Sequence, residues 1–157
     1  MTKTAIYAGT FDPITHGHVD ILQRAAPVFD EIIVVVAEST RKTTLFSWEQ
    51  RLQFCKESVR FISSVRVEKL VGLLVDFAKM YNVHYLIRGI RTTDDMMYEL
   101  SNASMNRKLS HNQLDTVFFP ASSEMMYVSA TLIREIISLR GDVSLFVPEC
   151  VVKHLQQ

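Results

Sequence analysis

The sequence contains few cysteines: Cys55 and Cys150 are the only two in 157 residues. They form no Cys-x-x-Cys pair, and no histidine stands at metal-binding spacing from either of them. We therefore expect two reduced structural thiols, which suit a reducing compartment.

Excess charge of either sign is also missing. Lys and Arg number 17, as do Asp and Glu, so the formal net charge is zero. A neutral chain lacks the overall basic field of a protein that binds nucleic acid without sequence preference. We expect no nucleic-acid partner, although local basic clusters remain able to bind phosphate groups.

Long apolar runs are absent as well. The longest, residues 32–37, is far too short to cross a bilayer. Near the N-terminus, Lys3 is followed closely by an Asp12-Pro13 turn, so no apolar signal-peptide segment develops. The sequence thus predicts a cytoplasmic protein with no membrane partner.

What the chain does contain is 48% hydrophobic residues, enough for a core, arranged as short apolar runs that alternate with helical patterns. No repeat or Pro/Gly/Ser-rich linker divides it, so we expect one domain over residues 1–157. The expected strands cover about 4–8, 32–37, 65–67, 84–88 and 116–119. The expected helices cover about 16–29, a stretch beginning at 47, and then 72–81, 93–109, 129–140 and 148–155. This alternation predicts an α/β fold: a Rossmann-like, doubly wound, five-stranded parallel sheet.

Ligands of such sheets bind beyond the carboxyl ends of the strands, so we expect the site residues among those that directly follow each strand. The first turn holds Gly9, Thr10 and Asp12-Pro13, and a helix begins with His16-Gly17-His18. The amides of a helix N-terminus favour anions, and an imidazole in that first turn can donate a hydrogen bond to a phosphoryl group. Two histidines at i and i+2 do not share a helix face, so His16 and His18 are a poor metal chelate.

Basic residues follow two further strands. Arg41-Lys42 comes after the second strand, and Arg88-Gly89-Ile90-Arg91 after the fourth. Lysine can hold a phosphate as a point charge, and arginine can bind one bidentately. Both segments are therefore candidate phosphate contacts, with a solvated basic loop as the alternative.

The next helices carry the remaining candidates. Glu99 lies one turn after Asp95, so the two carboxylates share a helix face, and a solvent-facing Glu99 is the alternative interpretation. Ser129 is a good N-cap for the helix that follows it, and the apolar residues 125–128 are placed to flank an adenine ring.

Taken together, Gly9-Thr10-Phe11-Asp12-Pro13 and Thr15-His16-Gly17-His18 resemble the signature of the nucleotidyltransferase superfamily, which reads His or Thr, any residue, Gly, His. Within that superfamily, the chain resembles the bacterial phosphopantetheine adenylyltransferase family over essentially its full length. The resemblance implies transfer of the adenylyl group of ATP to 4′-phosphopantetheine, giving 3′-dephospho-coenzyme A and pyrophosphate. It also implies Mg²⁺ on the phosphates, a homohexamer and feedback binding of coenzyme A.

The resemblance also carries over site residues. Those implied for catalysis are His18, as transition-state stabiliser, Thr10, Lys42 and Arg91. Those implied for ATP are Thr10, Phe11, His18, Gly89, Ile90, Arg91, Glu99, Met125, Met126, Tyr127, Val128, Ser129, Ala130 and Thr131. Those implied for phosphopantetheine are Thr10, Lys42, Leu74 and Arg88, with a core role as the alternative for Leu74. The family has a hydroxyl residue where this chain has Ala130, so one contact to ATP is absent. No residue is implied as a protein ligand to metal.

Other functions compete with this interpretation. The first turn by itself does not separate adenylyl transfer to 4′-phosphopantetheine from transfer to nicotinate mononucleotide, or from cytidylyl transfer. A regulatory module that binds adenine nucleotides without turnover is a further alternative. A redox Rossmann protein is disfavoured, because the first turn lacks Gly-x-Gly-x-x-Gly.

Overall fold

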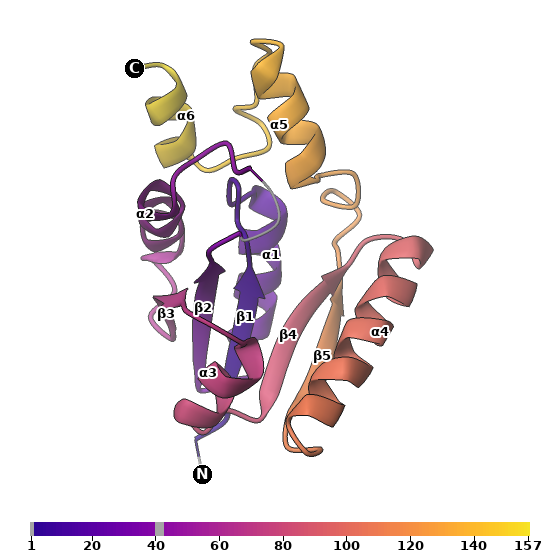
Figure 1. The fold of residues 1–157 in the computed structure, drawn as a ribbon. Coiled ribbons are helices and arrows are strands. Elements are labelled where there is room, and N and C mark those ends of the chain that lie inside the picture. The colour runs from indigo at the N-terminus through magenta and orange to yellow at the C-terminus, as the bar shows by residue number, and fades with distance from the viewer. Residues whose placement is uncertain (1, 40–42) are drawn as a thin grey trace.

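A computed structural model describes residues 2–39 and 43–157 of the chain. Its strands are β1 (Thr4–Gly9), β2 (Glu31–Ala37), β3 (Val65–Leu70), β4 (Tyr85–Ile90) and β5 (Asp115–Pro120). Its helices are α1 (His16–Ala25), α2 (Trp48–Val59), α3 (Leu74–Met80), α4 (Thr93–Leu109), α5 (Ala130–Ser138) and α6 (Glu149–Leu155). The five strands form one parallel sheet in the order β3-β2-β1-β4-β5, which confirms the predicted fold class (Figure 1).

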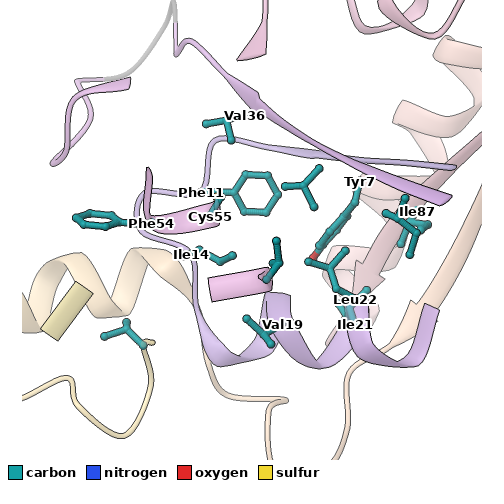
Figure 2. Packing of buried hydrophobic residues seen from close by; sticks show 14 of the residues in the cluster. Tyr7, Phe11, Ile14, Val19, Ile21, Leu22, Val36, Phe54, Cys55 and Ile87 are labelled. Atoms are coloured by element: carbon teal, nitrogen blue, oxygen red, sulfur yellow. The ribbon is translucent and has the colours of Figure 1, made fainter. Parts of the chain in front are cut away.

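Both faces of the sheet are covered, as the unbroken apolar composition of β2 predicts. Alternate residues of β1 and β2 enter opposite layers: Tyr7 and Val34 join the cluster with α1 and α2, while Ile6 and Val35 join the cluster with α3. In the first layer, apolar side chains of β1 and β2 pack against those of α1 and α2 (Figure 2). The strand order reverses beside β1, so the carboxyl ends of β1 and β4 form the switch point where ligands of such sheets bind.

Every predicted strand and helix is present, several with shifted ends. α1 ends at Ala25 instead of 29, because Pro27 has no N–H to continue the backbone hydrogen bonds. β4 runs to Ile90 instead of 88, because Gly89 and Ile90 pair with Phe119 and Pro120 of β5. A capping box of Ser47 and Gln50 starts α2 where the sequence predicts a helix to begin, and Cys55 and Cys150 are both free thiols.

Candidate active site

A cavity of about 290 Å³ opens at the carboxyl ends of β1 and β4. Its walls come from the turn after β1, the first turn of α1, the end of β4, the first two turns of α4 and the segment that leads into α5. These segments are far apart in the sequence, and the reversal of strand order brings them together. The cavity lies where the fold rule predicts a ligand.

His18 projects from the first turn of α1 and is held by the cap of its own helix. Thr15 is the N-cap residue, and its backbone N–H donates to Nδ1 of His18 over 2.9 Å. A ring nitrogen that accepts a hydrogen bond carries no proton, so the neutral ring has its proton on Nε2. The helix cap thereby selects the tautomer and leaves Nε2–H as the donor of the side chain.

The surroundings of His18 also keep the ring neutral. Burial, reinforced by the positive charges of Arg91 and Arg88, lowers the pKa of His18 to about 4. The edge of the Phe11 ring packs against it, with 5.0 Å between ring centroids. At neutral pH the imidazole is therefore an uncharged hydrogen-bond donor, as a stabiliser of phosphoryl charge requires.

Asp12 braces the turn that precedes α1. Its buried carboxylate accepts hydrogen bonds from the backbone amides of Leu45 and Phe46, at 2.8 and 2.9 Å. The guanidinium of Arg134, on α5, donates to the Asp12 carbonyl over 2.9 Å. The turn is thus tied to the segment before α2 and to α5, a role that the sequence pattern did not reveal.

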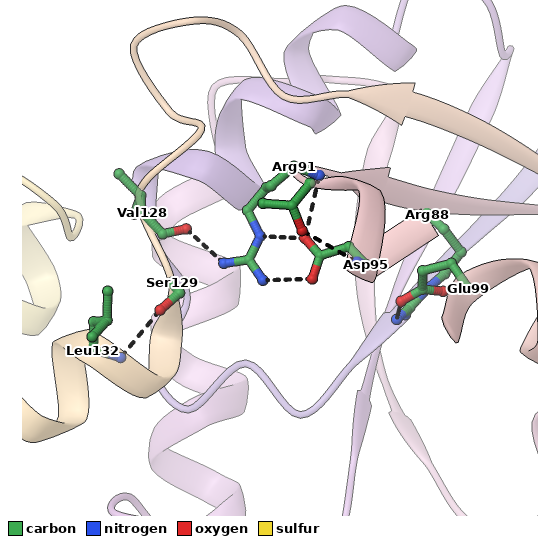
Figure 3. Close-up of polar contacts among 8 residues, drawn as sticks. Arg88, Arg91, Asp95, Glu99, Val128, Ser129 and Leu132 are labelled. Atoms are coloured by element: carbon green, nitrogen blue, oxygen red, sulfur yellow. Dashed lines mark hydrogen bonds and ion pairs between the residues drawn. The ribbon is translucent and has the colours of Figure 1, made fainter. Parts of the chain in front are cut away.

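The opposite wall is built from two arginine–carboxylate pairs between the end of β4 and α4 (Figure 3). Nε and Nη2 of Arg88 donate to the two carboxylate oxygens of Glu99 over 2.7 and 2.6 Å, and Nη1 donates to the Ala8 carbonyl. Nε of Arg91 donates to Asp95 over 3.0 Å, and Nη1 donates to the Val128 carbonyl over 3.1 Å. The shared helix face of Asp95 and Glu99 is confirmed. Glu99 is only 7% exposed, so the solvent-facing interpretation is wrong.

The two pairs differ in strength. Burial lowers the pKa of the Arg88 guanidinium, but the hydrogen bonds to Glu99 and its negative charge, with smaller effects of Tyr7 and Tyr98, together outweigh burial and leave that pKa above its ordinary value. Each arginine donates to both oxygens of its carboxylate, but the bonds from Arg88 to Glu99 are shorter and that carboxylate is buried, whereas the side chains of Arg91 and Asp95 are both about one-third exposed. Arg88 keeps further N–H groups on Nη1 and Nη2 for a ligand, since a guanidinium has five.

The predicted cap of α5 is also present. Ser129 accepts a hydrogen bond from the Leu132 amide over 3.1 Å, and residues 129–131 line the cavity. The helix N-terminus therefore meets the cavity opposite α4, and its amides favour an anion there.

Most of the sequence-predicted site residues lie around this cavity. Those lining it are Thr10, Phe11, His18, Arg88, Gly89, Arg91, Glu99, Met125, Val128, Ser129, Ala130 and Thr131. Gly89 permits the close approach of α1, because a Cβ there would stand 2.3 Å from Cδ1 of Ile21. Leu74 lines a neighbouring pocket of about 200 Å³ that shares Arg88 and Glu99 with the cavity. Lys42 lies outside the described residues.

The structure does not bring Ile90, Met126 and Tyr127 to the cavity lining. Residues 122–128 form turns, with hydrogen bonds from the Met125 amide to Ser122 and from the Val128 amide to Met125. Such i, i+3 turns place Met125 and Val128 on the cavity side. Met126 is 51% exposed and Tyr127 65% exposed.

Several lining residues were not predicted as contacts, among them Tyr7, Ile21, Asp95, Ala121 and Arg134. The sequence held a signal for Arg134, because it stands three residues after Thr131 and therefore on the same helix face. In the structure, Nη2 of Arg134 donates to the Thr131 hydroxyl over 3.1 Å. Tyr7 and Ile21 had no such signal, because both fit an ordinary core pattern.

Within the described residues, no group of three or more His, Cys, Asp or Glu side chains is placed to hold a metal ion. The helices of the same residues include none with the length and apolarity needed to cross a membrane.

The fold and the cavity define a Rossmann-like α/β protein whose switch-point cavity is lined by arginines and hydrogen-bond donors. Residues 6–136 match the family model described as cytidylyltransferase-like. Proteins named phosphopantetheine adenylyltransferase are similar over the whole chain. That of Legionella pneumophila (strain Lens) is 45% identical, with 92% of its length covered. That of Actinobacillus pleuropneumoniae serotype 5b is 46% identical, with 99% covered. The chain therefore belongs to the cytidylyltransferase-like family and, within it, to the phosphopantetheine adenylyltransferases.

A solved structure supports the fold. The crystal structure of a protein assigned as a nicotinate-nucleotide adenylyltransferase, from Vibrio parahaemolyticus, has a TM-score of 0.72 and 16% sequence identity. The alignment covers 99% of this chain and 91% of that one. At this identity the likeness concerns the fold alone.

Proposed function

We propose that this protein transfers the adenylyl group of ATP to 4′-phosphopantetheine. A phosphate oxygen of 4′-phosphopantetheine attacks the α-phosphorus of ATP, the bond from that phosphorus to the bridging oxygen of the β-phosphate breaks, and pyrophosphate leaves. The products are 3′-dephospho-coenzyme A and pyrophosphate. No side-chain nucleophile takes part, so catalysis consists of positioning and charge stabilisation.

One observation carries this proposal: a neutral His18 whose Nδ1 is occupied by the Thr15 amide and whose Nε2–H is left to donate. The attacking phosphate is already an anion, so the reaction needs no general base. It needs donors at the phosphoryl oxygens, where charge develops. His18 and Thr10 would act at the α-phosphoryl group. Arg91 and the amides at the start of α5 would act at the β- and γ-phosphates.

The acceptor is proposed from the relatives and from the second pocket. Proteins named phosphopantetheine adenylyltransferase match the chain from end to end at 45–46% identity. Leu74 lines the pocket next to the cavity, and Arg88 lies between the two. In this arrangement the phosphate of the acceptor meets Arg88 while its pantetheine arm lies towards Leu74. Lys42 is a further proposed contact of that phosphate.

Three further features are proposed by resemblance: Mg²⁺, a homohexamer and feedback binding of coenzyme A. A cytoplasmic location is proposed as well, because two free thiols suit a reducing compartment. Asp95 and Glu99 are already paired with arginines, so Mg²⁺ would be held mainly by the phosphates. Bound there, it would supply neutralisation of the phosphate charge.

The test is a pyrophosphate-release assay with purified protein. ATP is combined in turn with 4′-phosphopantetheine, nicotinate mononucleotide or no acceptor, and CTP replaces ATP in a parallel set. We expect release with ATP and 4′-phosphopantetheine only, with 3′-dephospho-coenzyme A identified by mass spectrometry. Pyrophosphate release with another nucleotide and acceptor would assign those as the substrates instead. Nucleotide binding without pyrophosphate release under any combination would favour a regulatory module.

A further inference from the structure

Arg51, on the first turn of α2, is the largest of the fully buried side chains of the described residues and is only 2% exposed. It is not among the residues that line the cavity. Its guanidinium donates to three backbone carbonyls: those of Thr10 over 2.5 Å, Ala37 over 2.7 Å and Phe46 over 3.2 Å. All three of these hydrogen bonds, one from Nε and two from Nη1, go to the backbone around the side chain.

The three carbonyls belong to three different segments. Thr10 is in the turn after β1, Ala37 is the last residue of β2, and Phe46 stands just before the N-cap of α2. One planar guanidinium thus joins the carboxyl ends of two neighbouring strands to the start of a helix. The forked geometry of arginine allows such a contact, whereas the single ammonium of lysine does not span three carbonyls in the same way.

The charge of Arg51 has no carboxylate in contact. Among residues 2–39 and 43–157, the ion pairs include every cavity arginine but not Arg51. Among the acidic groups, Asp12 has the largest electrostatic effect on the Arg51 guanidinium. The Asp12 carboxylate, however, is already hydrogen-bonded to the amides of Leu45 and Phe46. A buried charge without a paired counter-ion is costly, and an apolar side chain of similar volume often serves stability better. Its location directly behind Thr10, which lines the cavity, suggests a different reason for its presence.

We propose that Arg51 is a positioning residue for adenylyl transfer, which fixes Thr10 relative to the end of β2 and places a positive charge behind the turn. This inference rests on the proposed function, because it assigns Arg51 an effect on that reaction. Arg51 touches no substrate and acts through Thr10. Its loss therefore misplaces a group that is needed in the transition state and affects turnover more than ATP binding.

The experiment compares three variants of the full chain in the pyrophosphate assay. Arg51→Lys keeps the charge but breaks the three-way contact, and Arg51→Gln removes the charge. Val59→Ala is the matched control, since Val59 is also buried on α2, two turns further along, and has no part in the cavity. Each variant is characterised by kcat, by KM for both substrates and by thermal unfolding, and each is assayed at the same interval below its own Tm. If Arg51→Lys does not fold, Arg51→Gln takes its place.

We expect Arg51→Lys to lower kcat about 10- to 100-fold with the KM for ATP changed less than about threefold, as for a misplaced catalytic group. Val59→Ala should keep kcat within about twofold of the wild type, since Val59 is remote from the cavity and distant sites are rarely coupled energetically. A double mutant supplies the decisive readout: with Thr10→Ala already present, Arg51→Lys should have almost no further effect on kcat.

Three results would overturn the inference while leaving the proposed function intact: an unchanged kcat in Arg51→Lys, an equal loss in Val59→Ala, or multiplying effects of Thr10→Ala and Arg51→Lys. A wild-type protein that releases no pyrophosphate would instead remove the proposed function itself, so the two failures are distinguishable.

Discussion

Two walls of the cavity present hydrogen-bond donors to a ligand, one through a neutral histidine and the other through charged arginines. On the α1 wall, Thr15 and His18 form a compact unit of four residues that is uncharged at neutral pH. On the α4 wall, Arg88 and Arg91 are charged, and each is held by a carboxylate of α4, eleven and four residues further along the chain. The first wall offers one aligned donor, and the second offers cations whose positions depend on their partners.

The difference indicates how each wall keeps its geometry. The α1 wall is fixed by the hydrogen bonds of a helix cap, from the backbone amides of Thr15 and His18. The α4 wall is fixed by side-chain ion pairs, and their strength depends on burial and on the ionic strength of the solvent. At neutral pH, substitution of His18 on the first wall should therefore mainly lower the rate, and substitution of the carboxylates Asp95 and Glu99 on the second should mainly lower stability.

The largest effect is expected for His18→Ala. Removing the Nε2–H donor should lower kcat about 10²-fold or more, in line with the loss of one preorganised donor to a developing charge. The matched control is His16→Ala, two residues earlier on α1, because His16 does not line the cavity and its backbone N–H still bonds to the Phe146 carbonyl. Steady-state kinetics should separate the two variants. Equal turnover in wild type and His18→Ala would remove His18 from the reaction.

The neutrality of His18 predicts a pH dependence of stability. Its pKa is about 4 in the folded protein, against 6.5 ordinarily, so only the unfolded chain takes up a proton between these values. This contribution to stability is complete above about pH 6.5 and declines as the pH falls towards 4, by up to about 3 kcal/mol in all. Urea unfolding of wild type and His18→Asn at several pH values should show a steeper decline in the wild type, because His16, whose pKa burial also lowers, contributes equally to both proteins.

The same histidine has a direct spectroscopic readout. In a ¹⁵N NMR titration, the ring of His18 should remain in the Nε2–H tautomer down to about pH 5, since a group stays mostly neutral one unit above its pKa. A ring that titrates near its ordinary pKa, or a proton found on Nδ1, would contradict the selection of the tautomer by the Thr15 amide.

The two walls also differ in how far the sequence predicted them. The α1 wall depends on residues close together in the chain, so the motif placed Thr10 and His18 correctly. The α4 wall was predicted in part: the i, i+4 spacing put Asp95 and Glu99 on one face, but their pairing with Arg91 and Arg88 depends on how α4 lies against β4. Nothing in the spacing of Arg51 indicated that it reaches carbonyls of three separate segments. The exposure of Met126 and Tyr127 follows from turn geometry that an apolar run does not reveal.

On the α4 wall, the larger loss of stability is expected for Glu99→Gln. The Arg88–Glu99 pair is bidentate, and the Glu99 side chain is only 9% exposed, so the substitution leaves a largely buried guanidinium without its counter-ion. Breaking buried pairs of this kind is strongly destabilising. Because Arg88 is about one-third exposed, solvent weakens the effect. We expect the free energy of unfolding, measured by urea titration, to fall by about 2 kcal/mol. A loss no greater than that of Asp95→Asn would mean that the two pairs are equivalent.

The smallest effect is expected for Asp95→Asn. Asp95 and Arg91 are four residues apart, with side chains 29% and 36% exposed, and such pairs contribute about 0.5 kcal/mol. Asp95 also lies in the first turn of α4, where its charge favours the helix dipole, so the total loss should stay below about 1 kcal/mol. Salt gives the sharper comparison, because raising the ionic strength from about 0.01 M to about 1 M shortens the Debye length from about 30 Å to about 3 Å. The loss caused by Asp95→Asn should then largely disappear, whereas that caused by Glu99→Gln should persist, because water and ions reach the buried pair poorly. If both losses decline together, the Arg88–Glu99 pair behaves as a surface pair, and the two arginines of this wall differ less than their burial indicates.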